Sequence, residues 1–556
     1  MAAGSKSFSR LISVGASLSV ILLAAFVTRL LPLSISRFPF NNDSLTECGI
    51  ASEIMDNGHL TYSREAPWHG THSVATPALN VVLAFVSSSL DVSPYDCAQV
   101  VGATICVLTV GAIFLVARTI SGSHFGGFVA GFMAVMFGTF VFTTGSVWKG
   151  ALGVGLLAFA TITFMQRNDL RYRILCTLTL LTFPLVHHVV AALAMLFFLY
   201  LLFWSWFFAL SNGAVRRRHF LDLAMISVPV VVTGAYYSYV SLDRLSAYAY
   251  PIQIALLVSF FILFALLSVV VLSLRNHSKW TFSPFLGIAL ILLLSLDYFG
   301  YVFPYSASAA NAYFFLAIAF AFTFSLSWYG TELILENMPV HRSIQLAFLV
   351  APLTVISFGI SGGLTTSSHQ IVFRTFDYLY MFIFVGAGAG LAFLMKRRTR
   401  LYPIIGVVLA IAMVVSFPFA YDSDRLLGVR HDTQEFEVDA LSWAKDNIGA
   451  KKVISDERLS YVSWSLDWLV KDAGLPGYMT ESNTAILPGW ICLVEDSWTT
   501  TGVNAYPKGK VIIPKSNYTA IIDAADVVYV GGPLGNSATV FVGSQIGQTA
   551  LFGSSG

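Results

Sequence analysis

The sequence is poor in charged residues. Lys, Arg, Asp and Glu make up 11% of its 556 residues, against about 25% in an average soluble protein. Hydrophobic residues account for 56% of the chain. No soluble domain is this apolar throughout, so the composition excludes a soluble globular protein and predicts a polytopic membrane protein. The net charge is only +2, which argues against a nucleic-acid-binding protein.

Cysteine is also scarce, and none of the five cysteines has the Cys-x-x-Cys spacing of a zinc site. Cys48 and Cys97 fall in the same expected outer loop, near 34–97. They either form a disulfide there or remain two unpaired small apolar residues, and the sequence leaves both alternatives open. The first apolar run lacks a convincing signal-peptide cleavage site, so we interpret it as a retained membrane span.

Long hydrophobic runs dominate the chain up to residue 421. A membrane-spanning helix needs roughly 20 apolar residues, and by that criterion the sequence predicts about 13 spans. They are expected near 11–33, 98–118, 125–144, 149–166, 173–187, 189–210, 220–240, 251–274, 282–301, 311–332, 344–361, 376–395 and 402–420. The run 77–90 is shorter, and we interpret it as an interfacial or re-entrant helix in the first outer loop.

Lys and Arg are concentrated in alternate loops, as at 216–218 and 396–398. Cytoplasmic loops carry an excess of these residues, so the N-terminus and this set of loops are expected in the cytoplasm. The loop 34–97 and everything after residue 421 are then extracytoplasmic. The chain is therefore expected to be a multi-pass protein of the plasma membrane.

The composition becomes more polar after residue 421. A helix-like stretch at 435–447 precedes short strand-like runs near 452–455, 510–513 and 527–530. Alternating short helices and strands indicate a small α/β domain. We therefore predict a transmembrane domain at 1–421 and a small extracytoplasmic α/β domain at 422–556.

A polar stretch at 41–60 follows the first span directly and holds four acids, Asp43, Glu47, Glu53 and Asp56. If this stretch is helical, Asp43 and Glu47 lie four residues apart on one face. Asp43 is then placed at the membrane surface, where a carboxylate can accept or orient the proton of an acceptor hydroxyl. The alternative is that Asp43 is only the N-cap of the helix.

The register Asp43-Ser-Leu-Thr-Glu47, Ala51-Ser-Glu-Ile-Met55 and Gly58-His-Leu60 resembles the first outer loop of the GT-C glycosyltransferases. The resemblance implies a multispan enzyme that uses a polyprenyl-phosphate-linked sugar donor, with Asp43 as the catalytic carboxylate. The family's second acid is replaced here by Ser44, and we infer that Glu47 supplies the second charge. Oligosaccharyltransferase relatives bind a divalent cation, so Mg²⁺ or Mn²⁺ stays open as a cofactor, and no metal ligand is assigned.

Four further residues are candidates for donor binding. His187 and His188 stand together between two apolar runs, where they contact a phosphate or pyrophosphate, bind a metal or cap short spans. Arg374 lies on the outer side against the positive-inside rule and resembles the arginine with which oligosaccharyltransferase-type members hold the lipid-linked donor. The alternative for Arg374 is an ion pair with Asp377. His369, in the same segment, is included among the expected donor-binding residues.

These observations lead to an inverting glycosyltransferase that moves a sugar from a polyprenyl-phosphate donor to a lipid, glycan or protein acceptor on the outer membrane face. The resemblance to archaeal members points to an archaeal plasma membrane. Two alternatives remain: a transporter or flippase for a lipid-linked substrate, which predicts charged residues in several spans, and a non-catalytic membrane scaffold.

Overall fold

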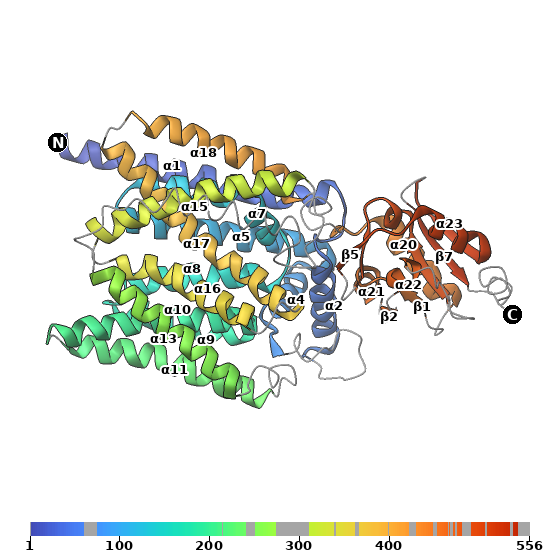
Figure 1. Ribbon diagram of the computed structural model, residues 1–556, viewed down its shortest axis with the longest axis horizontal. Coiled ribbons are helices and arrows are strands. Elements are labelled where there is room, and N and C mark those ends of the chain that lie inside the picture. Colours follow the sequence, from blue (N-terminus) through green and yellow to red (C-terminus); the bar gives the residue numbers. More distant parts are fainter. Residues whose placement is uncertain are drawn as a thin grey trace.

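The structure is a computed structural model, and Figure 1 shows a long helical bundle with a small sheet-containing part at one end. It describes residues 2–60, 75–213, 215–240, 251–273, 311–338, 341–361, 366–397, 400–421, 430–448, 453–464, 466, 471–472, 475–480, 491–505, 509–533 and 537–542. The chain is mostly helical and ends in a small sheet region, as expected of a polytopic membrane protein with a C-terminal α/β part.

Most helices of the bundle follow the apolar runs of the sequence, whereas the helix at 42–57 is formed by the polar stretch. The helices are α1 (Ala2–Leu30), α2 (Asn42–Asn57), α4 (Ala78–Leu90), α5 (Pro94–Ser121), α6 (His124–Met136), α7 (Gly138–Gly145), α8 (Lys149–Met165), α9 (Leu170–Val186), α10 (His188–Ser211), α11 (Arg217–Tyr239), α13 (Pro251–Ser273), α15 (Asn311–Asn337), α16 (Arg342–Ser361), α17 (Thr366–Lys396) and α18 (Tyr402–Ser416). The short 3₁₀ helices η1 (Leu31–Ser34) and η2 (Phe417–Ala420) follow α1 and α18.

Seven helices in the described part of the chain are long and apolar enough to cross a membrane, and the count rises to eight if one bent pair is a single span. The predicted count of about 13 is therefore not confirmed. The run 125–144, expected as one span, is instead α6 and α7, which meet at a 70° bend where Phe137 is extended. α4, α8 and α18 are apolar but shorter. The expected span 282–301 lies outside the described residues.

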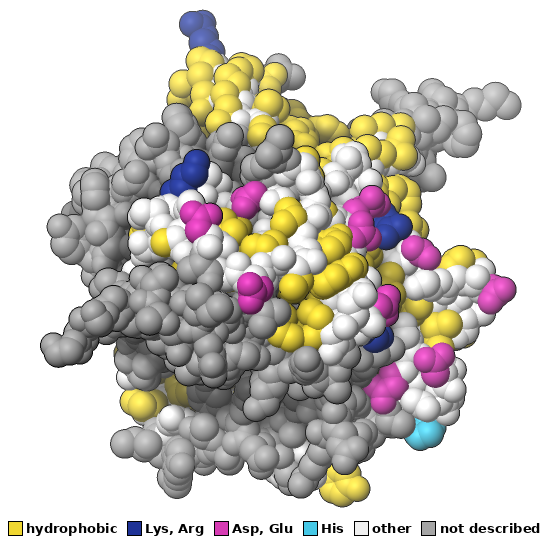
Figure 2. All heavy atoms as spheres, turned by 90° about the vertical axis from the view of Figure 1, so that its right-hand side faces the viewer, with side chains coloured by type: hydrophobic (Ala, Val, Ile, Leu, Met, Phe, Trp, Pro, Cys, Tyr) yellow, Lys and Arg dark blue, Asp and Glu magenta, His cyan; other side chains and the backbone are white. Residues whose placement is uncertain are grey.

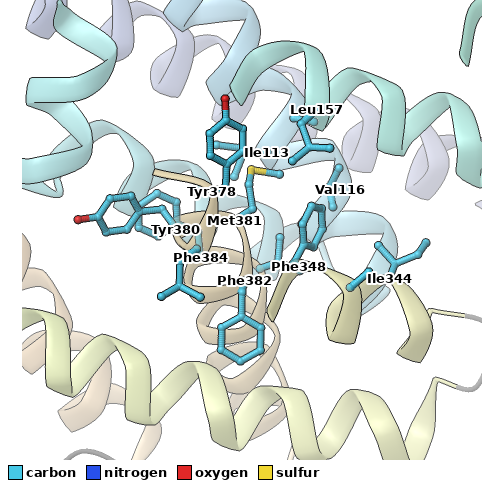
Figure 3. Close-up of a cluster of buried hydrophobic side chains, with 14 of the residues drawn as sticks. Ile113, Val116, Leu157, Ile344, Phe348, Tyr378, Tyr380, Met381, Phe382 and Phe384 are labelled. Atoms are coloured by element: carbon cyan, nitrogen blue, oxygen red, sulfur yellow. The ribbon is translucent and has the colours of Figure 1, made fainter. Parts of the chain in front are cut away.

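Helix α17 is the centre of the bundle, because 94% of its span is buried, against 11% of the span in α13. Small residues let neighbouring backbones approach it closely. A Cβ on Gly330 of α15 would overlap the carbonyl oxygen of Gly386 and stand 2.6 Å from the backbone nitrogen of Gly390. Figure 3 shows the aromatic and aliphatic side chains of α17, with Tyr378 and Phe382 among them, packed with those of neighbouring helices.

The C-terminal part contains a five-stranded sheet in the order β2-β1-β3-β7-β6. Strands β1, β2 and β3 are parallel, and β7 is antiparallel to both β3 and β6. A second sheet pairs β4 with β5 in antiparallel register. The strands of the two sheets are β1 (Val453–Ser455), β2 (Lys471–Asp472), β3 (Ile491–Glu495), β4 (Val503–Ala505), β5 (Gly509–Val511), β6 (Asp526–Gly531) and β7 (Ala538–Val542). The helices are α20 (Glu435–Ile448), α21 (Glu457–Trp464), α22 (Leu475–Thr480), η3 (Asp496–Thr499) and α23 (Lys515–Ala524).

The bundle and the C-terminal part meet at the segment before α2 and at α2 itself. The side chain of Leu45 is buried in the hydrophobic core of the C-terminal part, and α21 packs against α2. The backbone N–H of Asn41 donates to the carbonyl oxygen of His431 at 3.1 Å. The polar stretch that the sequence singled out is therefore held between the two parts of the molecule (Figure 1).

Buried ion pairs lie on the C-terminal side of this junction. Arg458 lies 2.8 Å from Glu437 and also contacts Glu495, and Arg430 lies 3.3 Å from Glu437. Each of these charges has a partner of opposite sign, which burial requires. Figure 2 views the molecule from the side of this C-terminal part, where acidic and hydrophobic side chains are interspersed and basic ones are sparse among the described residues.

Candidate functional site

Helix α2 begins one residue before Asp43. Its N-cap is Asn41, whose side-chain oxygen accepts a hydrogen bond from the backbone N–H of Asp43 at 3.1 Å. The alternative that Asp43 is itself the cap is therefore wrong. Asp43 lies in the first turn, where the helix dipole favours a negative charge. Its side chain is half-buried, and its carboxylate forms no ion pair within the described part of the chain.

The backbone just before Asp43 has an unusual conformation. Asn41 has a φ of +82°, which costs free energy in a residue other than glycine. Two hydrogen bonds hold this conformation in place. The backbone N–H of Asn41 donates to the His431 carbonyl oxygen, and the Asn41 side-chain oxygen accepts from the backbone N–H of Asp43. The entry of α2, and with it the position of Asp43, is therefore fixed from the C-terminal part of the chain.

Glu47 lies one turn further along the same face of α2, and it is buried and fully engaged. Its Oε1 is 3.3 Å from Nζ of Lys149, the first residue of α8, and its Oε2 accepts from the side-chain amide of Asn80 at 2.5 Å. Burial raises the pKa of Glu47, the ammonium of Lys149 opposes this rise, and the negative charge of Asp43 adds to it. Glu47 is thus part of an internal contact between α2, α4 and α8.

Arg374 and His187 meet although 187 residues separate them. Nη1 of Arg374 on α17 lies 3.0 Å from Nε2 of His187, which is the N-cap of α10. The ring of His188 stacks on that of His187, with 4.3 Å between the centroids. Asp377 accepts a hydrogen bond from Thr143 of α7 at 2.8 Å, and the expected alternative of an Arg374–Asp377 ion pair is not formed among the described residues.

Asp43 and Glu47 on α2 lie at the same end of the bundle as Arg374, because α8 contacts both regions. Lys149 begins α8, and Gly153 follows one turn later, a rise of about 6 Å. A Cβ on Gly153 would stand 2.6 Å from Oη of Tyr378, one turn after Arg374 on α17. The contacts thus run from Glu47 through the first turn of α8 to the segment of α17 that carries Arg374.

Sequence reasoning did not find every polar residue of this region. Lys149, Asn80 and Thr143 were not singled out, and the available signal was weak: a lysine and two uncharged polar residues within apolar runs. His369 falls in the first turn of α17, and its side chain lies outside the described residues.

All five cysteines are free and buried. Cys48 and Cys97 are accordingly two unpaired residues packed in one cluster, and the disulfide is not formed.

The arrangement does not fit a divalent cation at Glu47. Both carboxylate oxygens already accept from an ammonium and an amide, and no group of three His, Cys, Asp or Glu side chains in the described residues is placed to hold a metal ion. Mg²⁺ requires near-octahedral oxygen coordination at about 2.1 Å, which this donor set does not supply.

No protein-family model and no curated protein matches the sequence. Solved structures do match. An oligosaccharyltransferase of Archaeoglobus fulgidus in complex with Zn and sulfate is 13% identical with a TM-score of 0.54, covering 95% of this chain and 73% of that chain. The archaeal oligosaccharyltransferase AglB from the same organism, with an inhibitory peptide and a dolichol-phosphate, is 11% identical with a TM-score of 0.57, covering 96% and 75%.

The mycobacterial arabinofuranosyltransferase AftD also matches, at 13% identity and a TM-score of 0.51. The match covers 95% of this chain but only 41% of AftD. Both kinds of neighbour, oligosaccharyltransferase and arabinofuranosyltransferase, are glycosyltransferases of the GT-C type, and the likeness extends over nearly the whole of this chain. The chain therefore has the fold of the GT-C membrane glycosyltransferases.

Proposed function

We propose that this protein is a glycosyltransferase that moves a sugar from a polyprenyl-phosphate-linked donor to an acceptor at the extracytoplasmic membrane surface. One observation carries the proposal: in a chain with the GT-C fold, Asp43 and Arg374 lie at one end of the bundle, and neither is neutralised by an ion pair among the described residues. A carboxylate and a guanidinium at one end of a bundle suit a reaction that needs a proton acceptor and a phosphate ligand.

In the proposed mechanism, the Asp43 carboxylate accepts or orients the proton of the acceptor's nucleophilic group. That nucleophile attacks the anomeric carbon, the bond from this carbon to the phosphate oxygen breaks, and the configuration inverts. Arg374 donates to the phosphate oxygens and stabilises the negative charge of the departing polyprenyl phosphate. The half-buried Asp43 and the bundle's apolar outer surface suit a reaction between a water-facing acceptor and a lipid-borne donor.

The donor and acceptor classes follow from the neighbours' own ligands. One archaeal neighbour holds a dolichol-phosphate, and another is tethered to an acceptor peptide. A polyprenyl phosphate is therefore the donor carrier that we propose, and a lipid, glycan or protein hydroxyl or amide is the acceptor. We place this end on the extracytoplasmic side because the loops expected at the opposite end carry an excess of Lys and Arg.

The test uses the full chain purified in detergent, with radiolabelled sugars on a short polyprenyl phosphate and a panel of peptide, glycan and lipid acceptors. We expect label in an acceptor and release of polyprenyl phosphate. Asp43→Asn keeps the shape and removes the base, so transfer is expected to fall roughly 10²–10⁴-fold. Asp56→Asn, at the exposed far end of α2, is the matched control and should transfer normally. Equal transfer by D43N and wild type would contradict the mechanism.

The same preparation separates the alternatives. A flippase would move the intact labelled donor across reconstituted vesicles without breaking the bond between sugar and phosphate. A scaffold would neither move nor cleave it. Either result from the wild-type protein, across the whole acceptor panel, would replace the enzyme proposal.

A further inference from the structure

Lys149 is placed where a lysine costs free energy twice. Its side chain is only 7% exposed, and burial of an ammonium is unfavourable without a partner. It also begins α8, and the helix dipole disfavours a positive charge at a helix N-terminus. A residue that only closed a gap between helices would avoid both costs, so the charge itself needs an explanation.

The surroundings of Lys149 supply one. Its Nζ lies 3.3 Å from Oε1 of Glu47 and donates to the Thr76 hydroxyl at 3.2 Å. Asp43, one turn before Glu47, is close enough for its charge to act on Glu47. Two carboxylates close to each other do not readily ionise together, because their negative charges repel. A cation next to them removes this obstacle.

In sites built from paired carboxylates, a divalent metal ion commonly supplies that positive charge. One structural neighbour carries Zn, but the residues here do not fit a metal at Glu47, since an ammonium and an amide occupy its two oxygens. We propose that the ammonium of Lys149 takes the place of a divalent cation beside Asp43, so that Lys149 is a positioning residue and transfer does not require a divalent metal.

The inference rests on the proposed function, since the charge next to Asp43 matters for catalysis only if Asp43 must be ionised to accept a proton. Lys149 acts through Glu47: it holds the Glu47 carboxylate toward α8 and offsets its repulsion of Asp43. The ion pair also joins α2 to α8, the helix whose next turn meets Tyr378. A purely structural role would require only this last contact.

The first measurement compares sugar transfer by the full chain in detergent after chelation with EDTA and after addition of Mg²⁺ or Mn²⁺. We expect equal rates. Binding of Mn²⁺ is followed separately by electron paramagnetic resonance, which needs no substrate. Wild type is expected to leave Mn²⁺ free. Loss of transfer on chelation with recovery on Mn²⁺, or stoichiometric Mn²⁺ binding that Asp43→Asn abolishes, would overturn the proposal.

The second measurement separates charge from structure. Lys149→Gln leaves Glu47 buried without its partner and is expected to lower kcat roughly 10²–10³-fold, the usual effect of removing one catalytic electrostatic group. The double variant Lys149→Gln with Glu47→Gln replaces both charges by amides, so its fold should be retained and its melting temperature checks this. The double variant also removes the repulsion that Lys149 offsets, so it is expected to regain the wild-type pH–rate profile, whose acid limb Lys149→Gln moves to higher pH. An unshifted acid limb in Lys149→Gln would show that the pair is only structural.

The third measurement asks whether a metal can replace the ammonium. Lys149→Glu places a third carboxylate near Asp43 and Glu47, and we expect it to bind Mn²⁺ and to regain part of its transfer when Mn²⁺ is added. Lys396→Gln, at the exposed end of α17, is the matched control and should behave as wild type. A failure of the Lys149→Glu variant to bind Mn²⁺ would count against the proposal. If wild type transfers no sugar, the proposed function fails, while the Mn²⁺ measurements still decide the metal question.

Discussion

Arg374 and the backbone N–H of Val189 approach the two nitrogens of one imidazole, that of His187. Nη1 of Arg374 lies 3.0 Å from Nε2, and the Val189 nitrogen lies 3.2 Å from Nδ1. Both are donors, but a neutral imidazole has one acceptor nitrogen and an imidazolium has none. The ring therefore accepts only one of the two hydrogen bonds at a time. The contact between Arg374 and His187 is in competition with the N-cap of α10, which leaves the guanidinium ready to exchange His187 for an anionic ligand.

Replacing Arg374 should therefore weaken donor binding without loss of the fold. Hydrogen bonds to charged groups contribute about 1.5–3 kcal/mol, so we expect Arg374→Ala to raise KM for the polyprenyl-phosphate donor roughly 10–100-fold. Arg374→Lys keeps the charge but not the planar fork, and its effect should be intermediate. The measurement is the initial rate of transfer against donor concentration.

The matched control for this prediction is Arg397→Ala, which removes an exposed guanidinium from the opposite end of the same helix. Its KM for the donor should not change. A wild-type KM in Arg374→Ala would show that the phosphate is held elsewhere.

Close packing of α15 on α17 gives a prediction about stability. A Cβ on Gly330 would overlap the Gly386 carbonyl, and backbone cannot move aside as a flexible side chain can. We expect Gly330→Ala to destabilise the protein by on the order of 1–3 kcal/mol or more, as overpacked cores do. Thermal unfolding in detergent, followed by intrinsic tryptophan fluorescence, measures the effect.

Gly234→Ala, within α11, is the comparison for Gly330→Ala. No heavy atom lies within 4 Å of a Cβ built there. Alanine favours helix over glycine by about 0.5–1 kcal/mol, so this variant should match or exceed wild type in melting temperature. Equal melting temperatures for the two variants would mean that α15 and α17 are not in close contact in solution.

Local features of the structure could be predicted from the sequence because they depend on neighbouring residues. The expected helix at 435–447 is α20, and the strand-like runs near 452–455, 510–513 and 527–530 overlap β1, β5 and β6. The polar stretch after the first apolar run is helix α2, with Asp43 and Glu47 one turn apart. Periodicity and turn composition within a few residues carry this information.

Tertiary features could not be predicted in this way. Nothing near Lys149 in the sequence indicates a contact with Glu47, because the pair depends on how α8 packs against α2. The 70° bend between α6 and α7 occurs without a proline, in an apolar run that reads as one span. Asn41 and Asp43 are both good N-cap residues, so their spacing alone did not decide which one caps α2.

The junction between the two parts of the chain should depend on pH through His431. Its carbonyl holds Asn41, and its ring packs edge-on against Phe142 at 5.6 Å between centroids. Burial lowers the pKa of His431 to about 4, and the charge of Arg458 acts in the same direction. In the unfolded chain the value is near 6.5.

A folded-state pKa below the unfolded one means that acid favours the unfolded state. Above about pH 6.5 the imidazole is neutral in both states, and the contribution of His431 is fully present. As the pH falls toward 4, only the unfolded chain binds the proton, so stability is lost by on the order of 3 kcal/mol at most. Burial raises the pKa of Glu437 and gives the opposite slope, so wild type must be compared with a variant that differs only at His431.

That variant is His431→Asn, which cannot take up the proton. Near pH 7.5 it should melt below wild type because it loses the contact with Phe142, and the gap should narrow as the pH is lowered to 4. His59→Gln, which changes an exposed ring at the end of α2, is the control, and its melting temperatures should run parallel to those of wild type at every pH. A constant gap between His431→Asn and wild type would show that the imidazole remains accessible to protons in the folded protein, and that the segment before Asp43 is not held by a dry contact.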